Sequence, residues 1–300
     1  MEFKNINHLK SFMKKESDRL GLSIENTYNT YFARELLRIM SEKDKNNVFV
    51  TKGSFSQLVN LGKMVRPITD VDLTSTISHH DPLIVLIQAI CSTKEDNVEL
   101  DLRGKPKVTN TGMYKIPLIA KYKNGKFYQN MNMDYRENHP CILEQTEKPV
   151  PKIFEGDKEY KVIVPSIEET LAEKLCILVE SNKKDVLNTR VKDFYDIYKM
   201  HDGEYDIDKF TYYFKIMLLK RGKIALENAS AEHLNHEFLE NHQKEWEHSK
   251  KKYEFLDKDV TWSEALQYSK AVLVDQLKLA KKKTYPCYET YCKKHNIKFN

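Results

Sequence analysis

The sequence reads VFVTKGS at residues 48–54 and, after a gap long enough for a helix, RPITDVDL at residues 66–73. Hydrophobic patterning predicts a buried strand at 48–50, a helix at 55–60 and a strand at 68–73. A glycine between a strand and a helix lets a phosphate approach the backbone, and the helix start offers free N–H groups to it. We therefore expect Gly53 and Ser54 to form a phosphate-binding turn.

The second stretch places two carboxylates on one face of its strand. Asp70 and Asp72 are two residues apart, so they project to the same side while Val71 and Leu73 project into the core. Two such carboxylates repel each other, and Mg²⁺ completed by substrate phosphates relieves the repulsion. Each motif alone is common in solvated loops and strand edges, but together and in this order they predict a nucleotide-handling metal site.

Length and composition favour a cytoplasmic protein with two domains. The 300 residues are 40% hydrophobic and 31% charged, which is enough for one or two ordinary cores. We find no apolar run of 18 residues, and residues 1–20 are charged throughout, so we expect neither a membrane span nor a secretory signal. The five cysteines form no Cys-x-x-Cys pair and are expected to be reduced thiols: Cys91, Cys141, Cys176, Cys287 and Cys292.

A predicted hairpin supplies a third carboxylate. Its arms at residues 113–122 and 126–135 are joined through Asn124-Gly125, the dipeptide most favoured in tight turns. On the second arm, Asp134 shares a polar face with Tyr128, Asn130 and Asn132. If this arm neighbours the strand of Asp70 and Asp72, three carboxylates converge, enough to hold two metal ions. The alternative is an ordinary exposed aspartate at a strand end.

Helices are expected on both sides of these strands. Those at residues 5–20 and 24–42 precede them, and the second carries an apolar stripe of Tyr28, Tyr31, Phe32, Leu36, Leu37 and Met40. A helix from Pro82 to Ile90, a connection at 148–158 and a strand at 160–164 follow. From Ser166, which starts a capping box with Glu169, the pattern is helical to the end of the chain.

Two helical blocks carry charged residues whose purpose the pattern leaves open. Lys174 lies beside an apolar stripe, either snorkelling to solvent or aimed into a cleft. Arg190 and Asp193 are spaced as a helical ion pair, as are Lys192 and Asp196, which alone indicates surface pairing.

The C-terminal part of the chain suggests two further functions. Residues 270–300 contain eight lysines with interleaved tyrosines, which suits either a nucleic-acid-binding tail or a solvated basic helix. A metal site on one glutamate-rich helix is the weaker alternative, with these candidate ligands: His233, His236, His242 and His248.

Four blocks in combination resemble the AbiEii/AbiGii nucleotidyltransferase toxins of the DNA polymerase β-like superfamily. They are Lys52-Gly53-Ser54, Arg66-x-x-Thr69-Asp70-x-Asp72, Leu171-Ala172-Glu173-Lys174-Leu175 and Arg190-x-Lys192-Asp193-x-x-Asp196. The resemblance covers about residues 47–200. Relatives often have a second glycine and a threonine where this chain has Ser54-Phe55, and the gap from Gly53 to Asp70 is about a residue longer than usual.

The resemblance implies an α+β protein in which a nucleotidyltransferase domain (1–165), with a mixed sheet and flanking helices, faces an all-helical domain (166–300) with a basic C-terminal segment. The roles it implies are phosphate turn for Gly53 and Ser54, nucleotide contacts for Lys52 and Arg66, metal ligands for Asp70, Asp72 and Asp134, triphosphate contact for Lys174, and essential carboxylate for Asp193. The implied function is that of a Mg²⁺-dependent toxin of an abortive-infection toxin–antitoxin system. Such a toxin transfers a nucleoside monophosphate from an NTP, with GTP and CTP as candidates, to an RNA acceptor, namely the acceptor end of tRNA.

The resemblance also implies a partner, a cognate antitoxin that need not form a stable complex with the toxin. It implies no interaction with a membrane.

Two rival functions belong to other classes. A nucleotidyltransferase that modifies small molecules such as antibiotics shares the Gly-Ser and Asp-x-Asp pattern, but it needs no basic helical domain and no block like residues 190–196. A non-catalytic module that binds nucleic acid or an antitoxin is disfavoured because the expected acidic and basic positions are all filled.

Overall fold

The computed structural model describes residues 3–43, 48–75, 86, 90, 94–95, 98–122, 127–137, 144–181, 190–200 and 203–282. The chain divides into two compact units, one of Met1–Ser166 with Ser249–Lys258 and one of Ile167–His248 with Asp259–Asn300. Several predictions fall outside the described residues: the Asn124-Gly125 turn, most of the helix from Pro82 to Ile90, the lysines after Lys282 and all cysteines but Cys176. Cys176 is a buried thiol that forms no disulfide.

The first unit is built on one mixed sheet, whose described strands are β1 (Phe49–Thr51), β2 (Val71–Ser75), β3 (Lys94–Glu95), β4 (Val98–Leu102), β5 (Lys107–Val108), β6 (Tyr114–Tyr122), β7 (Phe127–Glu137), β8 (Gln145–Pro149) and β9 (Lys161–Pro165). Their order is β3-β4-β6-β7-β2-β1-β9-β8, with β5 beside β6. The predicted β6–β7 hairpin pairing is confirmed. At the centre, β1 is antiparallel to β2, whereas β2 and β7 run parallel.

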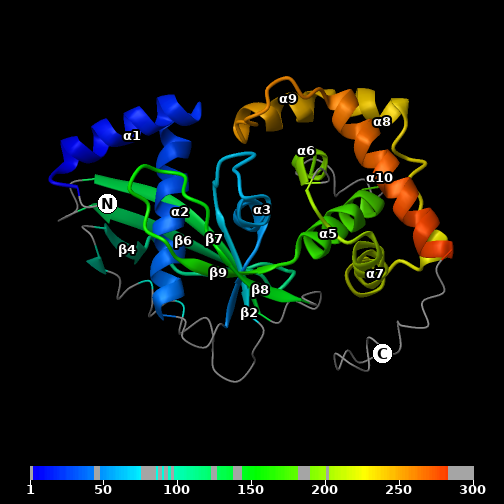
Figure 1. Cartoon of the computed structure of the whole chain (residues 1–300), viewed down its shortest axis with the longest axis horizontal. Helices are drawn as coiled ribbons and strands as arrows, with labels where there is room; N and C mark the ends of the chain where they lie inside the picture. The colour runs from blue at the N-terminus through cyan, green and yellow to red at the C-terminus, as the bar shows by residue number, and fades with distance from the viewer. Residues whose placement is uncertain are drawn as a thin grey trace. The chain divides into compact units, whose positions relative to one another are not determined.

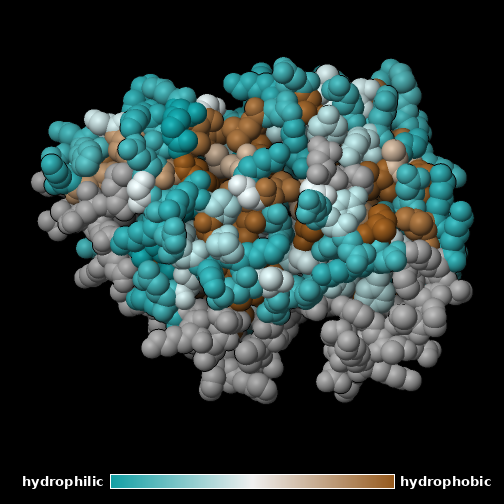
Figure 2. Space-filling model, in the orientation of Figure 1, coloured by the Kyte–Doolittle hydropathy of each residue, from teal (hydrophilic) through white to brown (hydrophobic). Residues whose placement is uncertain are grey.

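Helices α2 (Ile24–Lys43) and α3 (Gly53–Leu61) pack on this sheet, and α1 (Ile6–Leu20) packs on α2 (Figure 1). Helix α2 contacts β7 and β9, and its predicted apolar stripe is buried throughout. Helix α1 buries Leu9, Phe12 and Met13, and its other side is hydrophilic (Figure 2). Helix α3 is buried on every side from Ser54 to Val59, so its polar residues are enclosed as well.

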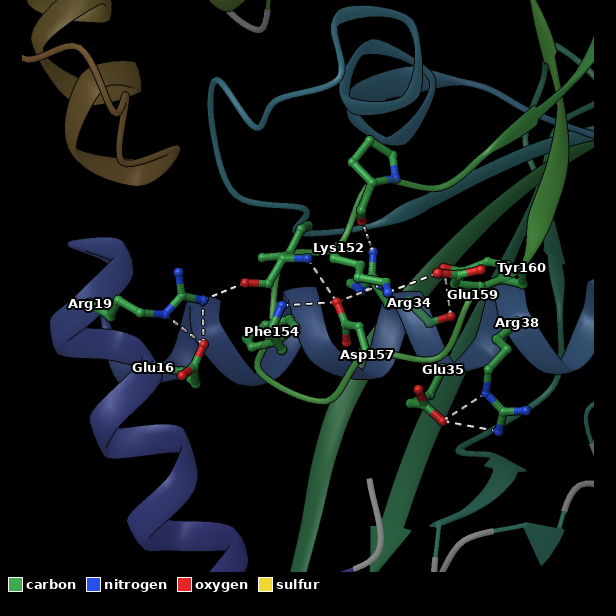
Figure 3. Close-up of polar contacts among 12 residues, drawn as sticks. Glu16, Arg19, Arg34, Glu35, Arg38, Lys152, Phe154, Asp157, Glu159 and Tyr160 are labelled. Carbon is green, nitrogen blue, oxygen red and sulfur yellow. Dashed lines mark hydrogen bonds and ion pairs between the residues drawn. The ribbon is translucent and has the colours of Figure 1, made fainter.

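A buried ion pair fastens the connection between β8 and β9 to α2 (Figure 3). The Arg34 Nη2 atom lies 2.6 Å from Asp157 Oδ2, with side chains only 3% and 6% exposed. Arg34 Nη1 also donates to the Pro151 carbonyl at 2.9 Å. Asp157 Oδ2 accepts from the backbone N–H groups of Ile153 and Phe154, each at 2.8 Å. One residue of α2 thus fixes a segment whose sequence predicted only a connection.

Replacing Arg34 by methionine is expected to lower the free energy of unfolding by about 3 kcal/mol, because the Asp157 carboxylate stays buried without its counter-charge. Denaturant unfolding of the whole chain measures the change. Lys152→Met is the matched control, since Lys152 and Glu159 form an ion pair at 2.8 Å with side chains 60% and 83% exposed. Because this pair is exposed to solvent, the variant should unfold at the same denaturant concentration as the wild type. Equal losses in both variants would contradict the prediction.

Every element that the structure describes after Ser166 is helical, as expected. These elements are α5 (Ile167–Glu180), α6 (Lys192–Met200), α7 (Ile207–Met217), a π-helical turn (Leu218–Gly222), a 3-10 turn (Leu226–Asn228), α8 (His236–Asn241), α9 (Gln243–Lys252) and α10 (Trp262–Lys282). In the second unit, Trp246 and Trp262 are fully buried and stack with ring centroids 5.2 Å apart. The architecture is therefore the predicted α+β class.

The first unit also includes Ser249–Lys258, which the division at residue 165 assigned to the helical domain. Its contacts explain the grouping: the Leu256 N–H donates to the Val65 carbonyl at 3.2 Å, and Ser23 N–H donates to Glu254 at 2.8 Å. Among the described residues, no helix combines the length and apolar content that crossing a membrane requires.

Candidate active site

The predicted glycine turn lies where β1 passes into α3. Strand β1 ends at Thr51, Lys52 is extended and Gly53 begins the helix with a φ of +63°, in the left-handed region that favours glycine. The Lys52 N–H donates to the Asp72 carbonyl at 2.8 Å, which continues the β1–β2 ladder by one step. The first residues of α3 therefore lie directly beside Asp72.

Asp72 lies against the backbone of Gly53. A Cβ atom built on Gly53 would lie 1.9 Å from Asp72 Oδ2 and 2.9 Å from its Cγ. Only glycine permits this approach, and it brings a carboxylate to the N-terminal end of α3, where the helix dipole favours negative charge. The sequence predicted that the phosphate turn and the metal pair belong to one site, and the structure places Gly53 in contact with Asp72.

The third predicted carboxylate lies beside the second. In the parallel β2–β7 pairing, Asp72 is in register with Asp134. Both are half-buried, whereas Val71, Leu73, Met133 and Tyr135 on the opposite face are fully buried. Asp70 precedes β2 by one residue and is also half-buried, and its Oδ1 accepts from the Thr69 hydroxyl at 3.3 Å. The strand of Asp134 is thus the neighbour of the strand of Asp72, as the sequence-based hypothesis required.

The donor chemistry of this site suits a hard divalent cation. Asp72 and Asp134 offer carboxylate oxygens from adjacent strands, and Mg²⁺ is usually held by one or two carboxylates with substrate phosphates and water as the other ligands. Within the part of the chain that the structure describes, no group of three or more His, Cys, Asp or Glu side chains is arranged to hold a metal. The adjacent pair Asp72 and Asp134 supplies the number of carboxylates with which Mg²⁺ is usually bound when phosphates complete its ligands.

The second candidate cluster centres on Lys174 of α5. Its Nζ lies 2.7 Å from Asp193 Oδ1 and 2.8 Å from Asp196 Oδ2, and the three side chains are 11%, 3% and 0% exposed. Arg190 Nη1 lies 3.8 Å from the other Asp193 oxygen. The lysine therefore does not snorkel to solvent. Sequence reasoning gave Asp196 a partner on its own helix, and its contact with Lys174 was missed, although Asp193 and Asp196 share a face of α6.

Ser54 and Arg66, the remaining predicted nucleotide contacts, are buried in the first unit, and Lys52 is half-buried. The Ser54 hydroxyl is enclosed without a hydrogen-bond partner among the described residues. The Arg66 guanidinium lies 5.7 Å from the centre of the Tyr253 ring, so this arginine packs on the segment that joins the first unit late in the sequence.

The histidine cluster does not lie on one helix, which corrects the sequence-based interpretation. His236 begins α8, His248 lies in α9, and His233 and His242 lie outside both. His233 Nε2 is 3.0 Å from the Leu178 carbonyl and 2.9 Å from the Ser181 hydroxyl. Burial lowers the pKa of His233 below its usual value, which favours the neutral ring that donates to the carbonyl. This histidine has a structural role.

Comparison with known proteins gives a family and a fold. The family model described as "Nucleotidyl transferase AbiEii toxin, Type IV TA system" matches residues 35–268. The structure resembles MenT4, the nucleotidyltransferase toxin Rv2826c of Mycobacterium tuberculosis H37Rv, with a TM-score of 0.54 and 14% identity over 89% of this chain and 98% of that one. JHP933 from Helicobacter pylori is similar at a TM-score of 0.51 and 13% identity, over 87% of this chain and 97% of that one. No curated protein matches the sequence.

Proposed function

The chain belongs to the AbiEii family of nucleotidyltransferase toxins of type IV toxin–antitoxin systems, and from this premise we propose that it transfers a nucleoside monophosphate from an NTP to the acceptor end of tRNA. GTP and CTP are the candidate donors. The donor nucleotide, the metal ion and the RNA acceptor are parts of the proposal, whereas the family supplies the reaction class and the toxin role.

One arrangement carries the proposal: Asp72 touches Gly53 at the start of α3 and is in register with Asp134 on β7. A phosphate on the N–H groups at the start of α3, which have no partner within the helix, would lie beside these carboxylates. Bound Mg²⁺ would stabilise the charge that develops on the attacking and leaving oxygens. The role of Asp70, Asp72 and Asp134 in this scheme is to hold the metal close to the phosphate turn.

The buried lysine network supports a second part of the mechanism. We propose that Lys174 contacts the triphosphate and that Asp193 orients its ammonium group, since Asp193 Oδ1 accepts from Nζ at 2.7 Å. Two carboxylates hold this ammonium in position, as electrostatic stabilisation of a phosphate requires. Lys52 and Arg66 would add positive charge near the nucleotide.

The experiment that tests the function is label transfer from each of four α-labelled NTPs to total tRNA with Mg²⁺, comparing the wild type with Asp70→Ala. We expect one NTP to label tRNA and the variant to lose the signal. Labelling of an antibiotic in place of RNA would support the small-molecule alternative. NTP binding without transfer to any acceptor, together with unchanged toxicity of Asp70→Ala in cells, would support a non-catalytic module.

Lys174→Met is expected to lower transfer about 30-fold, the value of one hydrogen bond between charged groups. Because methionine leaves Asp193 and Asp196 without the lysine, the double variant Lys174→Met/Asp196→Asn relieves part of the charge repulsion and separates folding from activity. Lys209→Met is the control, since Lys209 Nζ lies 3.9 Å from Glu168 in a looser pair. Full activity in the double variant would exclude a triphosphate contact for Lys174.

The toxin–antitoxin family also implies a partner. We propose a cognate antitoxin encoded beside this gene that acts without forming a stable complex with the toxin. Co-expression with the neighbouring reading frame tests it: rescue of growth without co-purification is expected, whereas a complex that survives purification would show direct binding.

A further inference from the structure

Gln57 of α3 is a polar residue that the proposed mechanism does not use. Its side chain is 0% exposed, and neither its amide oxygen nor its amide nitrogen has a hydrogen-bond partner among the described residues. The hydroxyl of Ser54, on the same helix, is enclosed and unpartnered in the same way. Three polar atoms without partners therefore lie within the first two turns of α3.

Such an arrangement costs stability in the ligand-free protein. An enclosed polar group without a partner keeps its full desolvation penalty, and an apolar side chain of similar volume would avoid it. The buried Gln276 shows the ordinary solution, since its Oε1 accepts from the Thr211 hydroxyl at 2.8 Å. The unpartnered atoms on α3 thus indicate a partner that arrives with a ligand.

The helix geometry relates Gln57 to the phosphate turn. Gln57 follows Ser54 by three residues and Gly53 by four, so all three lie on one face of α3. Helical side chains lean toward the helix N-terminus, which aims the Gln57 amide at the turn that begins with Gly53. The second unpartnered group, the Ser54 hydroxyl, belongs to the residue that directly follows Gly53 in the first turn of α3.

We propose that Gln57 is a positioning residue of the nucleotide site, which holds the Ser54 hydroxyl toward a phosphate bound at the start of α3. A hydroxyl has one proton to donate and can accept at the same time. When Ser54 donates its proton to a phosphate oxygen, its own oxygen accepts from the Gln57 amide, and each bond strengthens the other. This inference rests on the proposed function, because it assumes that the turn binds phosphate.

Gln57→Met separates this role from a structural one. Methionine has nearly the same volume without the amide, so we expect the melting temperature of the ligand-free chain to stay equal or rise. The affinities for Mg²⁺–GTP, Mg²⁺–CTP and inorganic tripolyphosphate should fall about fivefold to tenfold, as loss of one hydrogen bond implies. A lower melting temperature with unchanged affinities would show that Gln57 is a structural residue and overturn the inference.

Gln276→Met is the matched control in the second unit. It removes the partner of Thr211, so its melting temperature should fall while ligand affinity stays that of the wild type. Gln57→Asn, which keeps an amide on a shorter side chain, should recover part of the affinity that methionine loses.

A double-variant cycle tests whether Gln57 acts through Ser54. If it does, Ser54→Ala and Ser54→Ala/Gln57→Met should bind tripolyphosphate equally weakly, whereas additive losses would contradict the coupling. The wild type also separates this inference from the proposed function. A wild type that binds neither nucleotide nor tripolyphosphate would refute the phosphate turn itself, while normal binding by both wild type and Gln57→Met would refute the Gln57 role alone.

Discussion

Gly53→Ala is expected to lower nucleotide transfer on the order of 10²-fold, because the new Cβ would lie 1.9 Å from Asp72 Oδ2 and must displace that carboxylate. The backbone at Gly53 adds a second penalty. A φ of +63° is costly for alanine, and this strain amounts to about 1–2 kcal/mol of stability. The label-transfer assay and thermal unfolding of the same preparation measure the two effects separately.

Gly62→Ala is the control that separates the effect of backbone strain from the effect of displacing the Asp72 carboxylate. Gly62 ends the same helix with a φ of +68°, but a Cβ there meets no atom within 4 Å. This variant should lose a similar amount of stability and keep its transfer activity. If both alanine variants lose activity equally, helix strain explains the loss and the contact between Gly53 and Asp72 has no catalytic importance.

Asp72→Asn is expected to have the largest effect, lowering transfer on the order of 10³-fold with the fold retained. An amide keeps the size of the carboxylate but removes the negative charge beside Asp134 that would attract Mg²⁺. The metal adds an independent measurement, since Mg²⁺ should raise the melting temperature of the wild type more than that of the variant.

Asp101→Asn is the matched control for Asp72→Asn. Asp101 lies on β4 of the same sheet, is 51% exposed and forms an ion pair with Lys121 at 3.0 Å. It should transfer nucleotide within twofold of the wild type. Activity in Asp72→Asn near that of the control would remove Asp72 from the metal site.

The candidate acidic site shows how far local patterns extend. Alternation along the strands predicted that Asp134 lies on a polar face and that Asp70 and Asp72 share a side, because side-chain direction follows from a two-residue period. The register of Asp72 with Asp134 depends on the pairing of strands that are distant in sequence, which no local pattern contains. The same limit applies to Lys174, for which the sequence left two orientations open until α5 and α6 were seen to pack.

Strand β8 shows why an element can escape prediction altogether. Its sequence Gln-Thr-Glu-Lys-Pro is polar, and the strand lies at the end of the sheet order with alternate residues exposed. An edge strand of this kind buries little apolar surface, so hydrophobic periodicity gives no signal. Gln57 is the reverse case, because a polar residue in a short helix predicts exposure, whereas α3 is enclosed on all sides.

The parallel pairing of β2 with β7 also determines when, during synthesis and folding, the candidate active site of this toxin can form. The paired positions are 62 residues apart, and β7 joins β2 only after the intervening chain has been made and folded back. A polypeptide still emerging from the ribosome carries Asp72 without its neighbour. The two carboxylates therefore come together only when folding brings β7 into the sheet. The pair is absent from the unfinished chain on the ribosome and forms only after β7 has been synthesised.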